Sequence, residues 1–134
     1  GSESSLISVD PHEAQPHNHQ HVQLALRQIN EEGRLVQIQK RSDDASRILS
    51  RQAASLIYID GCHSFEQVVA DFENYIDLLA PGGCMLFHDY GCGDHNGIPE
   101  THPGVRKAVD SHVLGSSCLQ PLLLAHTLFA FVKR

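Results

Sequence analysis

The sequence lacks clustered lysine and arginine. It has 10 basic residues against 16 acidic ones, and its formal net charge is −6. Because clustered basic side chains are needed to neutralise a nucleic-acid backbone, this composition disfavours a nucleic-acid-binding protein. Long apolar runs are missing as well, since none approaches the roughly 20 residues that a membrane-spanning helix needs. We therefore expect neither nucleic acid nor a membrane as a partner.

Paired cysteine motifs are also missing. The four cysteines are Cys62, Cys84, Cys92 and Cys118, and none forms a Cys-x-x-Cys pair. Unpaired cysteines in an α/β pattern suit a reducing compartment better than a disulfide scaffold, so we expect a cytoplasmic protein. Cys84 lies in an apolar run and is interpreted as an inert thiol of the core.

The remaining composition is sufficient for one folded domain. The 134 residues are long enough to bury a core, and an apolar fraction of 41% argues against disorder. The sequence contains no internal repeat. We expect residues 1–134 to form a single domain.

Strand-like and helix-like patterns alternate along the chain. Strands are expected at 5–10, 35–39, 56–59, 84–87, 119–124 and 127–132, and helices at 22–32, 42–51, 65–79 and 103–113. Ser42 or Asp43 is the expected N-cap of the second helix, and Pro103 takes the favoured first position of the last one. Alternating elements followed by a terminal hairpin indicate an α/β fold with a doubly wound sheet.

Residues 55–90 hold the clearest pattern. Two short apolar runs of the buried-strand type flank a helical periodicity. Ser64 and Gln67 form a capping box, and Pro81-Gly82-Gly83 is the expected end of the helix. The segment is therefore a βαβ unit, and its right-handed crossover makes the two strands parallel.

Polar clusters follow both strands of this unit, as Asp60-Gly61-Cys62-His63 and His88-Asp89-Tyr90. Ligands of open α/β sheets gather at such carboxyl ends. Asp60 and Asp89 can hold Mg²⁺ or a similar hard cation there, or they only cap the following loops. His88 is a further ligand, a substrate contact or a histidine hydrogen-bonded at the sheet rim. Strand alternation places His88 and Asp89 on opposite faces, so one ion should not bind both unless the strand has ended.

The order of elements and these motifs resemble the class I S-adenosylmethionine-dependent methyltransferases, in particular their small-molecule O-methyltransferase subgroup. The matching motifs are Ile59-Asp60-Gly61-Cys62-His63-Ser64-Phe65-Glu66, Asp71, Leu78-Leu79, Pro81-Gly82-Gly83 and His88-Asp89. The resemblance covers Leu6 to Val132. It implies a Rossmann-like, mostly parallel sheet with an antiparallel C-terminal hairpin. It also implies methyl transfer from S-adenosylmethionine to a small-molecule hydroxyl.

The resemblance assigns roles on the acceptor side of the reaction. Related catechol-type enzymes hold a divalent cation on acids at equivalent strand ends, which implies a Mg²⁺ or similar site at Asp60 and Asp89. Asp60 and His63 would be the catalytic pair. His63, three residues after Asp60, would be the general base that takes the hydroxyl proton.

The resemblance also assigns roles on the cofactor side. Asp10 would bind the ribose hydroxyls of S-adenosylmethionine, because a carboxylate accepts two hydroxyl hydrogen bonds. The alternative is a turn acid before Pro11. Ser42 and Asp43 would contact adenine, and the alternative is that they cap the helix.

One departure from the family concerns this cofactor side. Residues 5–10 resemble the family's second strand, so we expect the first strand, first helix and glycine-rich loop to be missing and cofactor binding to be weak. In the family, the first strand lies between the second and the fourth, and its absence would leave two edges unpaired. The missing strand leaves three alternatives. The sheet closes directly, a homodimer exchanges a strand, or the chain is a fragment of a longer protein.

Other interpretations stay open. The chain can be a non-catalytic methyltransferase-like module that binds partners or oligomerises through its sheet edges. A histidine-rich segment, with His12, His17, His19 and His21, is a candidate Zn²⁺ or Ni²⁺ site, although such loops are usually solvated. A zinc site built from Cys92, Asp94 and His95 with Cys62 or His63 would match no standard spacing.

Overall fold

The computed structural model describes residues 5–11, 27, 35–91 and 102–134. The chain divides into two compact units, Gly1–Ile48 and Leu49–Arg134, which we call the N-terminal and C-terminal units. Apart from Arg27, the expected helix at 22–32 lies outside the described residues. So do the four histidines of the histidine-rich segment and the candidate zinc ligands Cys92, Asp94 and His95.

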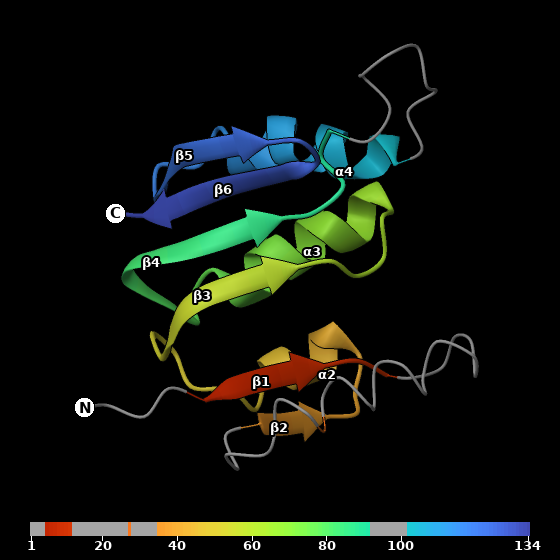
Figure 1. The fold of residues 1–134 in the computed structure, drawn as a ribbon, viewed down its shortest axis with the longest axis vertical. Helices are drawn as coiled ribbons and strands as arrows, with labels where there is room; N and C mark the ends of the chain where they lie inside the picture. Colours follow the sequence, from red (N-terminus) through yellow and green to blue (C-terminus); the bar gives the residue numbers. More distant parts are fainter. Residues whose placement is uncertain (1–4, 12–26, 28–34, 92–101) are drawn as a thin grey trace. The chain divides into compact units, whose positions relative to one another are not determined.

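In the N-terminal unit, two short strands form a parallel pair (Figure 1). They are β1 (Leu6–Val9) and β2 (Leu35–Ile38), as the apolar patterns predict. The helix α2 (Ser42–Ser46) follows, but its N-cap is Arg41 and no side chain caps it. The expected cap at Ser42 or Asp43 is wrong, because the backbone already enters the helix at Ser42. The helix is also shorter than expected.

In the C-terminal unit, four strands form one sheet in the order β3-β4-β6-β5 (Figure 1). Their bounds are β3 (Ala54–Ile59), β4 (Leu79–Phe87), β5 (Leu119–Ala125) and β6 (Leu128–Lys133). Strand β3 is parallel to β4, whereas β6 is antiparallel to both β4 and β5. The predicted βαβ unit and the predicted C-terminal hairpin are both confirmed.

Helix α3 (Phe65–Tyr75) connects β3 to β4 and starts as expected, with Ser64 Oγ accepting from the Gln67 amide at 3.3 Å. It ends earlier than expected. The Lys133 ammonium donates to the carbonyls of Ile76 and Leu79 at 2.7 and 2.8 Å, so a distant strand satisfies the carbonyls just beyond the helix.

The Pro81-Gly82-Gly83 sequence therefore does not stop the helix. It lies inside β4, where the register against β3 shifts and Gly82 has φ +76°. A side chain at Gly83 would lie only 2.8 Å from Leu79 Cδ1. The glycines thus permit a bulge in the strand that a larger residue would obstruct.

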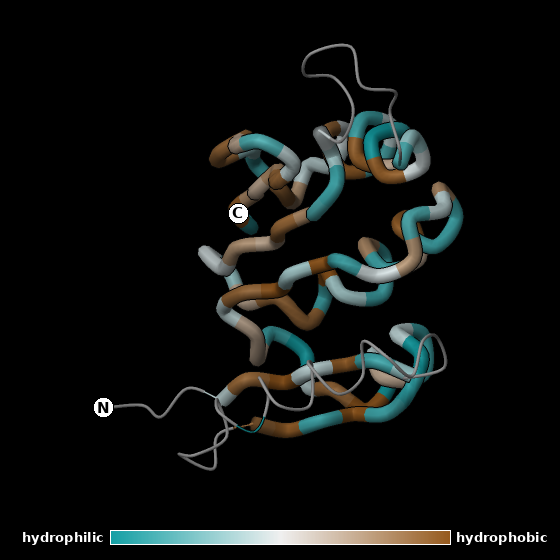
Figure 2. The backbone as a smooth tube through the Cα atoms, turned by 45° about the vertical axis from the view of Figure 1, so that its right-hand side comes forward, coloured by the Kyte–Doolittle hydropathy of each residue, from teal (hydrophilic) through white to brown (hydrophobic). Residues whose placement is uncertain are grey.

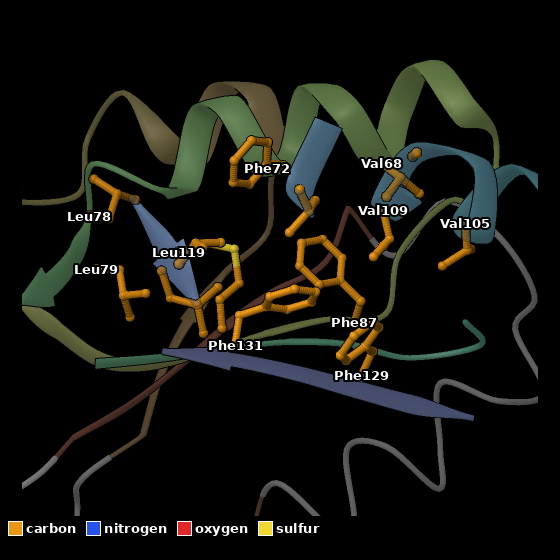
Figure 3. Close-up of a cluster of buried hydrophobic side chains, with 14 residues drawn as sticks. Val68, Phe72, Leu78, Leu79, Phe87, Val105, Val109, Leu119, Phe129 and Phe131 are labelled. Atoms are coloured by element: carbon orange, nitrogen blue, oxygen red, sulfur yellow. The ribbon is translucent and has the colours of Figure 1, made fainter. Parts of the chain in front are cut away.

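The core of the C-terminal unit lies between the helices and one face of the sheet (Figure 3). Helix α4 (Pro103–Ala108) begins with its proline, as expected, and continues as a π-helical turn, η2 (Val109–Val113). The largest fully buried side chains are Phe87, Phe131, Leu79, Met85, Val109 and Val113. No described helix is both long and apolar enough to cross a membrane.

Strand β3 is an edge of the four-stranded sheet, and the described residues of β1 pair only with β2. Hydrophobic stretches run along the strands of both units (Figure 2). Several are exposed, including Leu56 on β3 and Leu122, Leu123 and Leu124 on the opposite edge strand β5.

Candidate functional site

The candidate site forms where β3 and β4 end side by side. Ile59 and Phe87, the last residues of these parallel strands, are register partners, and the His88 amide donates to the Ile59 carbonyl at 3.0 Å. The loops that begin with Asp60 and His88 therefore start next to each other. The predicted proximity of the two polar clusters follows directly from this register.

The turn after β4 reverses one expectation. Strand β4 ends at Phe87, and Asp89 has a left-handed backbone with φ +59°. Such a conformation is uncommon outside glycine, although aspartate tolerates it better than most residues. Because strand alternation has ended, His88 and Asp89 do not point to opposite sides: His88 Nδ1 lies 3.2 Å from Asp89 Oδ1.

Tyr90 holds this turn in place. Its amide donates to the Thr127 carbonyl at 2.9 Å, and its hydroxyl donates to Asp110 Oδ1 at 2.8 Å. Arg106 covers the ring at 5.4 Å and donates to the Tyr90 carbonyl at 3.3 Å. The turn is thus tied to η2, α4 and the β5–β6 hairpin, and only 12% of the Asp89 side chain is exposed.

The structure brings the predicted catalytic and metal residues together. His63 Nε2 lies 3.0 Å from Asp89 Oδ2 and 3.8 Å from Asp60 Oδ1. On the other side, Asp60 Oδ1 is 3.3 Å from His88 Nδ1. Two carboxylates and two imidazoles therefore share one small polar site.

Two ring nitrogens in this site are buried without an aligned hydrogen-bond partner, His63 Nε2 and His88 Nδ1. Buried polar atoms are almost always satisfied, so these two nitrogens are candidate ligand atoms. The other nitrogen of His88 is 3.4 Å from Thr127 Oγ1. If that nitrogen donates to the hydroxyl, the lone pair of Nδ1 faces two carboxylates, and a cation bound between them would relieve the repulsion.

His102 is a member of the site that the sequence reasoning missed. It precedes Pro103 as the N-cap residue of α4. Its ring centroid is 4.0 Å from that of His63, and its Nε2 is 3.9 Å from Asp89 Oδ2. The sequence feature that could have indicated this proximity is the glycine at position 104. A Cβ there would overlap the His63 carbonyl and lie 2.7 Å from the Phe65 amide nitrogen, so glycine allows the start of α4 to approach His63.

Tyr58 on β3 was also missed. Burial raises the pKa of its phenol above the usual value of 10.0, and the negative charges of Asp60 and Asp89 raise it further. The ring centroid lies 6.0 Å from that of His88. The phenol therefore stays protonated near neutral pH and can donate a hydrogen bond beside the carboxylates.

The predicted cofactor residues lie in the N-terminal unit. Asp10 directly follows β1, and its amide donates to the Ile38 carbonyl at 3.2 Å. Ser42 and Asp43 form the first turn of α2. These positions match the strand end and helix start expected from the resemblance, and the assigned roles in ribose and adenine binding stay predictions.

Comparison with known proteins decides the family. A family model described as a methyltransferase domain matches residues 1–90 of the chain. The chain belongs to this family. The resemblance to class I S-adenosylmethionine-dependent methyltransferases is thereby confirmed.

Solved structures agree on the fold of this methyltransferase domain. A protein from Corynebacterium glutamicum superposes with a TM-score of 0.69 at 18% identity, over 96% of this chain and 60% of that one. An O-methyltransferase from Bacillus cereus, in complex with SAH, has a TM-score of 0.65 at 14% identity, over 96% and 63%. The Rossmann-like methyltransferase fold is confirmed.

A curated relative is an uncharacterized protein from Sinorhizobium fredii, 32% identical over 84 residues. The alignment covers 63% of this chain and 8% of that relative. The chain thus spans a small part of this relative, and it covers 60% and 63% of the two solved structures described above.

Proposed function

We propose that the chain contributes the acceptor side of an S-adenosylmethionine-dependent O-methyltransferase that acts on a small-molecule hydroxyl. The observation that carries the proposal is the contact between His63 Nε2 and Asp89 Oδ2 at 3.0 Å, at the carboxyl ends of two parallel strands. A buried nitrogen without an aligned partner, next to a carboxylate, is suited to accept a proton. The O-methyltransferase among the structural neighbours supports the reaction class.

The chemistry needs a hydroxyl that becomes nucleophilic as the methyl group arrives. S-adenosylmethionine supplies the electrophilic methyl group on a sulfonium, which leaves as a neutral thioether. His63 Nε2 takes the hydroxyl proton as the oxygen–carbon bond forms. The adjacent Asp89 carboxylate stabilises the resulting imidazolium, and Asp60 at 3.8 Å adds negative charge on the same side.

A divalent cation fits the other side of the site. Asp60 Oδ1 and Asp89 Oδ1 lie 3.3 and 3.2 Å from the orphaned His88 Nδ1, so three donors converge on one small volume. Asp60, Asp89 and His88 would hold the cation. It would bind the acceptor oxygen and lower its pKa, which eases the proton transfer to His63.

The cofactor would be bound from the N-terminal unit. Asp10 follows the carboxyl end of β1, where an acid can accept both ribose hydroxyls. Ser42 and Asp43 open α2, a position from which they would contact adenine. Isothermal titration with S-adenosylmethionine tests this assignment, and substitution Asp10→Asn should weaken any binding because one acceptor oxygen becomes a donor.

Release of S-adenosylhomocysteine, measured with a panel of catechols, phenols and sugars as acceptors, tests the activity. With any acceptor that is turned over, His63→Gln should lower the rate at least about 100-fold, since general bases contribute about 10²–10⁴. His112→Gln, an exposed histidine on η2, is the matched control. A rate that His63→Gln leaves unchanged would exclude His63 as the base.

A second candidate function is self-association through open sheet edges. Strand β5 is an edge strand, and Leu122, Leu123 and Leu124 on it are 55–59% exposed. Such an edge can pair with the same edge of a second copy around a two-fold axis. Light scattering after size exclusion should then show a dimer that Leu123→Lys disrupts, and a monomer at all concentrations would contradict it.

A further inference from the structure

The Asp89 carboxylate has two sides, and the proposed divalent cation uses only one of them. Oδ1 lies 3.2 Å from His88, on the side of Asp60. Oδ2 lies 3.0 Å from His63 Nε2 and 3.9 Å from His102 Nε2. A second set of three metal-ligating groups thus shares Asp89 with the first.

We propose that His63, His102 and Asp89 Oδ2 form a Zn²⁺ subsite, and that Zn²⁺ bound there inhibits methyl transfer. Binding of Zn²⁺ depends on these three residues alone. The inhibitory effect rests on the proposed role of His63 as the base. The two parts of the proposal can therefore fail separately.

The donor types select the metal. Two imidazoles and one carboxylate are ligands of the kind that bind zinc in open sites, with a fourth position left for water. Their ligand atoms all lie within 4.8 Å of one another. Mg²⁺ prefers six oxygen ligands in an octahedron, so this nitrogen-rich subsite should reject it.

The packing of the two histidines supports a shared ligand. Their rings lie side by side, with centroids 4.0 Å apart, and each offers Nε2 to the same carboxylate oxygen. His63 Nε2 is buried and has no aligned hydrogen-bond partner. A cation between these three atoms would satisfy the buried nitrogen and offset the charge of Asp89.

The backbone holds this arrangement. His102 is fixed at the start of α4, and Gly104 lets that helix approach the backbone of His63 and Phe65 more closely than any side chain would allow. Asp89 is fixed from the other side by the turn that Tyr90 anchors. The three ligands therefore come from three separate segments whose positions are set by packing.

The consequence for the reaction follows from the chemistry of imidazole. His63 Nε2 has one lone pair, which can hold either a proton or a metal ion. While Zn²⁺ occupies it, His63 cannot accept the proton of the acceptor hydroxyl. Zinc should therefore inhibit, in contrast to the cation proposed at Asp60, which should assist.

Direct binding of Zn²⁺ tests the subsite without requiring activity. The 134-residue chain is prepared with His12, His17, His19 and His21 replaced by glutamine, so that the histidine-rich segment does not compete for metal. Titration of Zn²⁺ in excess Mg²⁺ should reveal one binding site. Its Zn²⁺ affinity should fall at least about tenfold in His102→Gln, because substitutions around metal sites commonly cost that much affinity. His112→Gln should leave the affinity unchanged. Circular dichroism establishes that each variant is folded.

Co²⁺ provides a spectroscopic check of the ligands. Bound to His63, His102 and Asp89 it should show the intense visible absorption of a four-coordinate site. His102→Gln should abolish that absorption. A Zn²⁺ affinity unchanged by His102→Gln, or lowered equally by His112→Gln, would overturn the subsite.

Inhibition is a separate arm of the experiment. With an acceptor that is turned over, the Zn²⁺ concentration for half-inhibition should rise at least about tenfold in His102→Gln, measured against that variant's own zinc-free rate. Zinc binding that depends on His102 but leaves the rate unchanged would overturn the inhibitory role and keep the subsite. An absence of any methyl transfer would count against the proposed function alone.

Discussion

The loops after β3 and β4 contribute to the same site but are held very differently. The turn that carries Asp89 is tied to α4, η2 and the β5–β6 hairpin through Tyr90, and 12% of the Asp89 side chain is exposed. The loop that carries Asp60 has mainly exposed residues, and 41% of the Asp60 side chain is exposed. Asp89 is therefore the fixed point of the site.

The largest effect should come from Asp89→Asn. Asparagine has the same shape and also tolerates the left-handed backbone, so the fold should survive. The loss of charge removes the partner of His63 and a donor from both proposed metal subsites. We expect turnover to fall at least about 100-fold, measured as S-adenosylhomocysteine release.

The same variant should also weaken Zn²⁺ binding at least about tenfold in isothermal titration. Glu73→Gln, which removes an exposed carboxylate from α3, controls for the general loss of negative charge. Equal effects of the two substitutions would mean that Asp89 acts only through the net charge of the surface.

Gly104→Ala tests how closely α4 must approach the loop after β3. The new Cβ would overlap the His63 carbonyl, so the helix or the loop must move. We expect a loss of about 1–3 kcal/mol in unfolding free energy, typical of overpacking. Urea denaturation measures it, and Gly115→Ala, where the nearest atom would be 3.9 Å away, is the control.

Whichever of the two moves, His63 and His102 separate, so Gly104→Ala should also weaken Zn²⁺ binding. Unchanged stability would show that the two backbones can move apart without cost. Unchanged Zn²⁺ affinity would show that their close approach does not position the histidines.

Asp60→Asn should have a narrower effect. It removes one oxygen from the subsite of the proposed assisting cation, whose affinity should fall at least about tenfold in a Mn²⁺ titration. Asp60 is 3.8 Å from His63 Nε2 and is partly exposed, so Zn²⁺ binding should change less than about fivefold. A larger loss of Zn²⁺ affinity would mean that the two proposed subsites are a single metal site.

The part of the site that local patterns determine could be predicted from the sequence. Apolar runs and helical periodicity define the βαβ unit, and parallel strands then bring Asp60, His63 and Asp89 to one edge. The role of His63 came from the resemblance to a methyltransferase family. None of this requires knowledge of distant contacts.

The rest depends on contacts between distant segments. His88 joins Asp89 because a turn anchored to Thr127 and Asp110 ends the strand at Phe87. His102 joins His63 because Gly104 permits a close approach of two backbones. Similarly, the Lys133 ammonium donates hydrogen bonds to carbonyls just beyond α3, and this helix ends before the residue that the sequence pattern predicted.

Tyr90→Phe should have the smallest effect and tests why the turn after β4 is rigid. The substitution removes the hydroxyl that donates to Asp110, but it keeps the ring packed on Phe129 at 4.9 Å and under Arg106. It also keeps the amide bond to the Thr127 carbonyl. Since the lost hydrogen bond is exposed, unfolding free energy should fall by at most about 1 kcal/mol, measured by urea denaturation.

Backbone bonds and ring packing would then hold Asp89 in place, so Zn²⁺ affinity should not change in Tyr90→Phe. A double-mutant cycle with Asp110→Asn isolates the hydroxyl contact from other effects of either substitution. If Tyr90→Phe alone weakened Zn²⁺ binding tenfold, the exposed hydrogen bond would be what fixes Asp89. The two loops would then differ much less in rigidity than their contacts indicate.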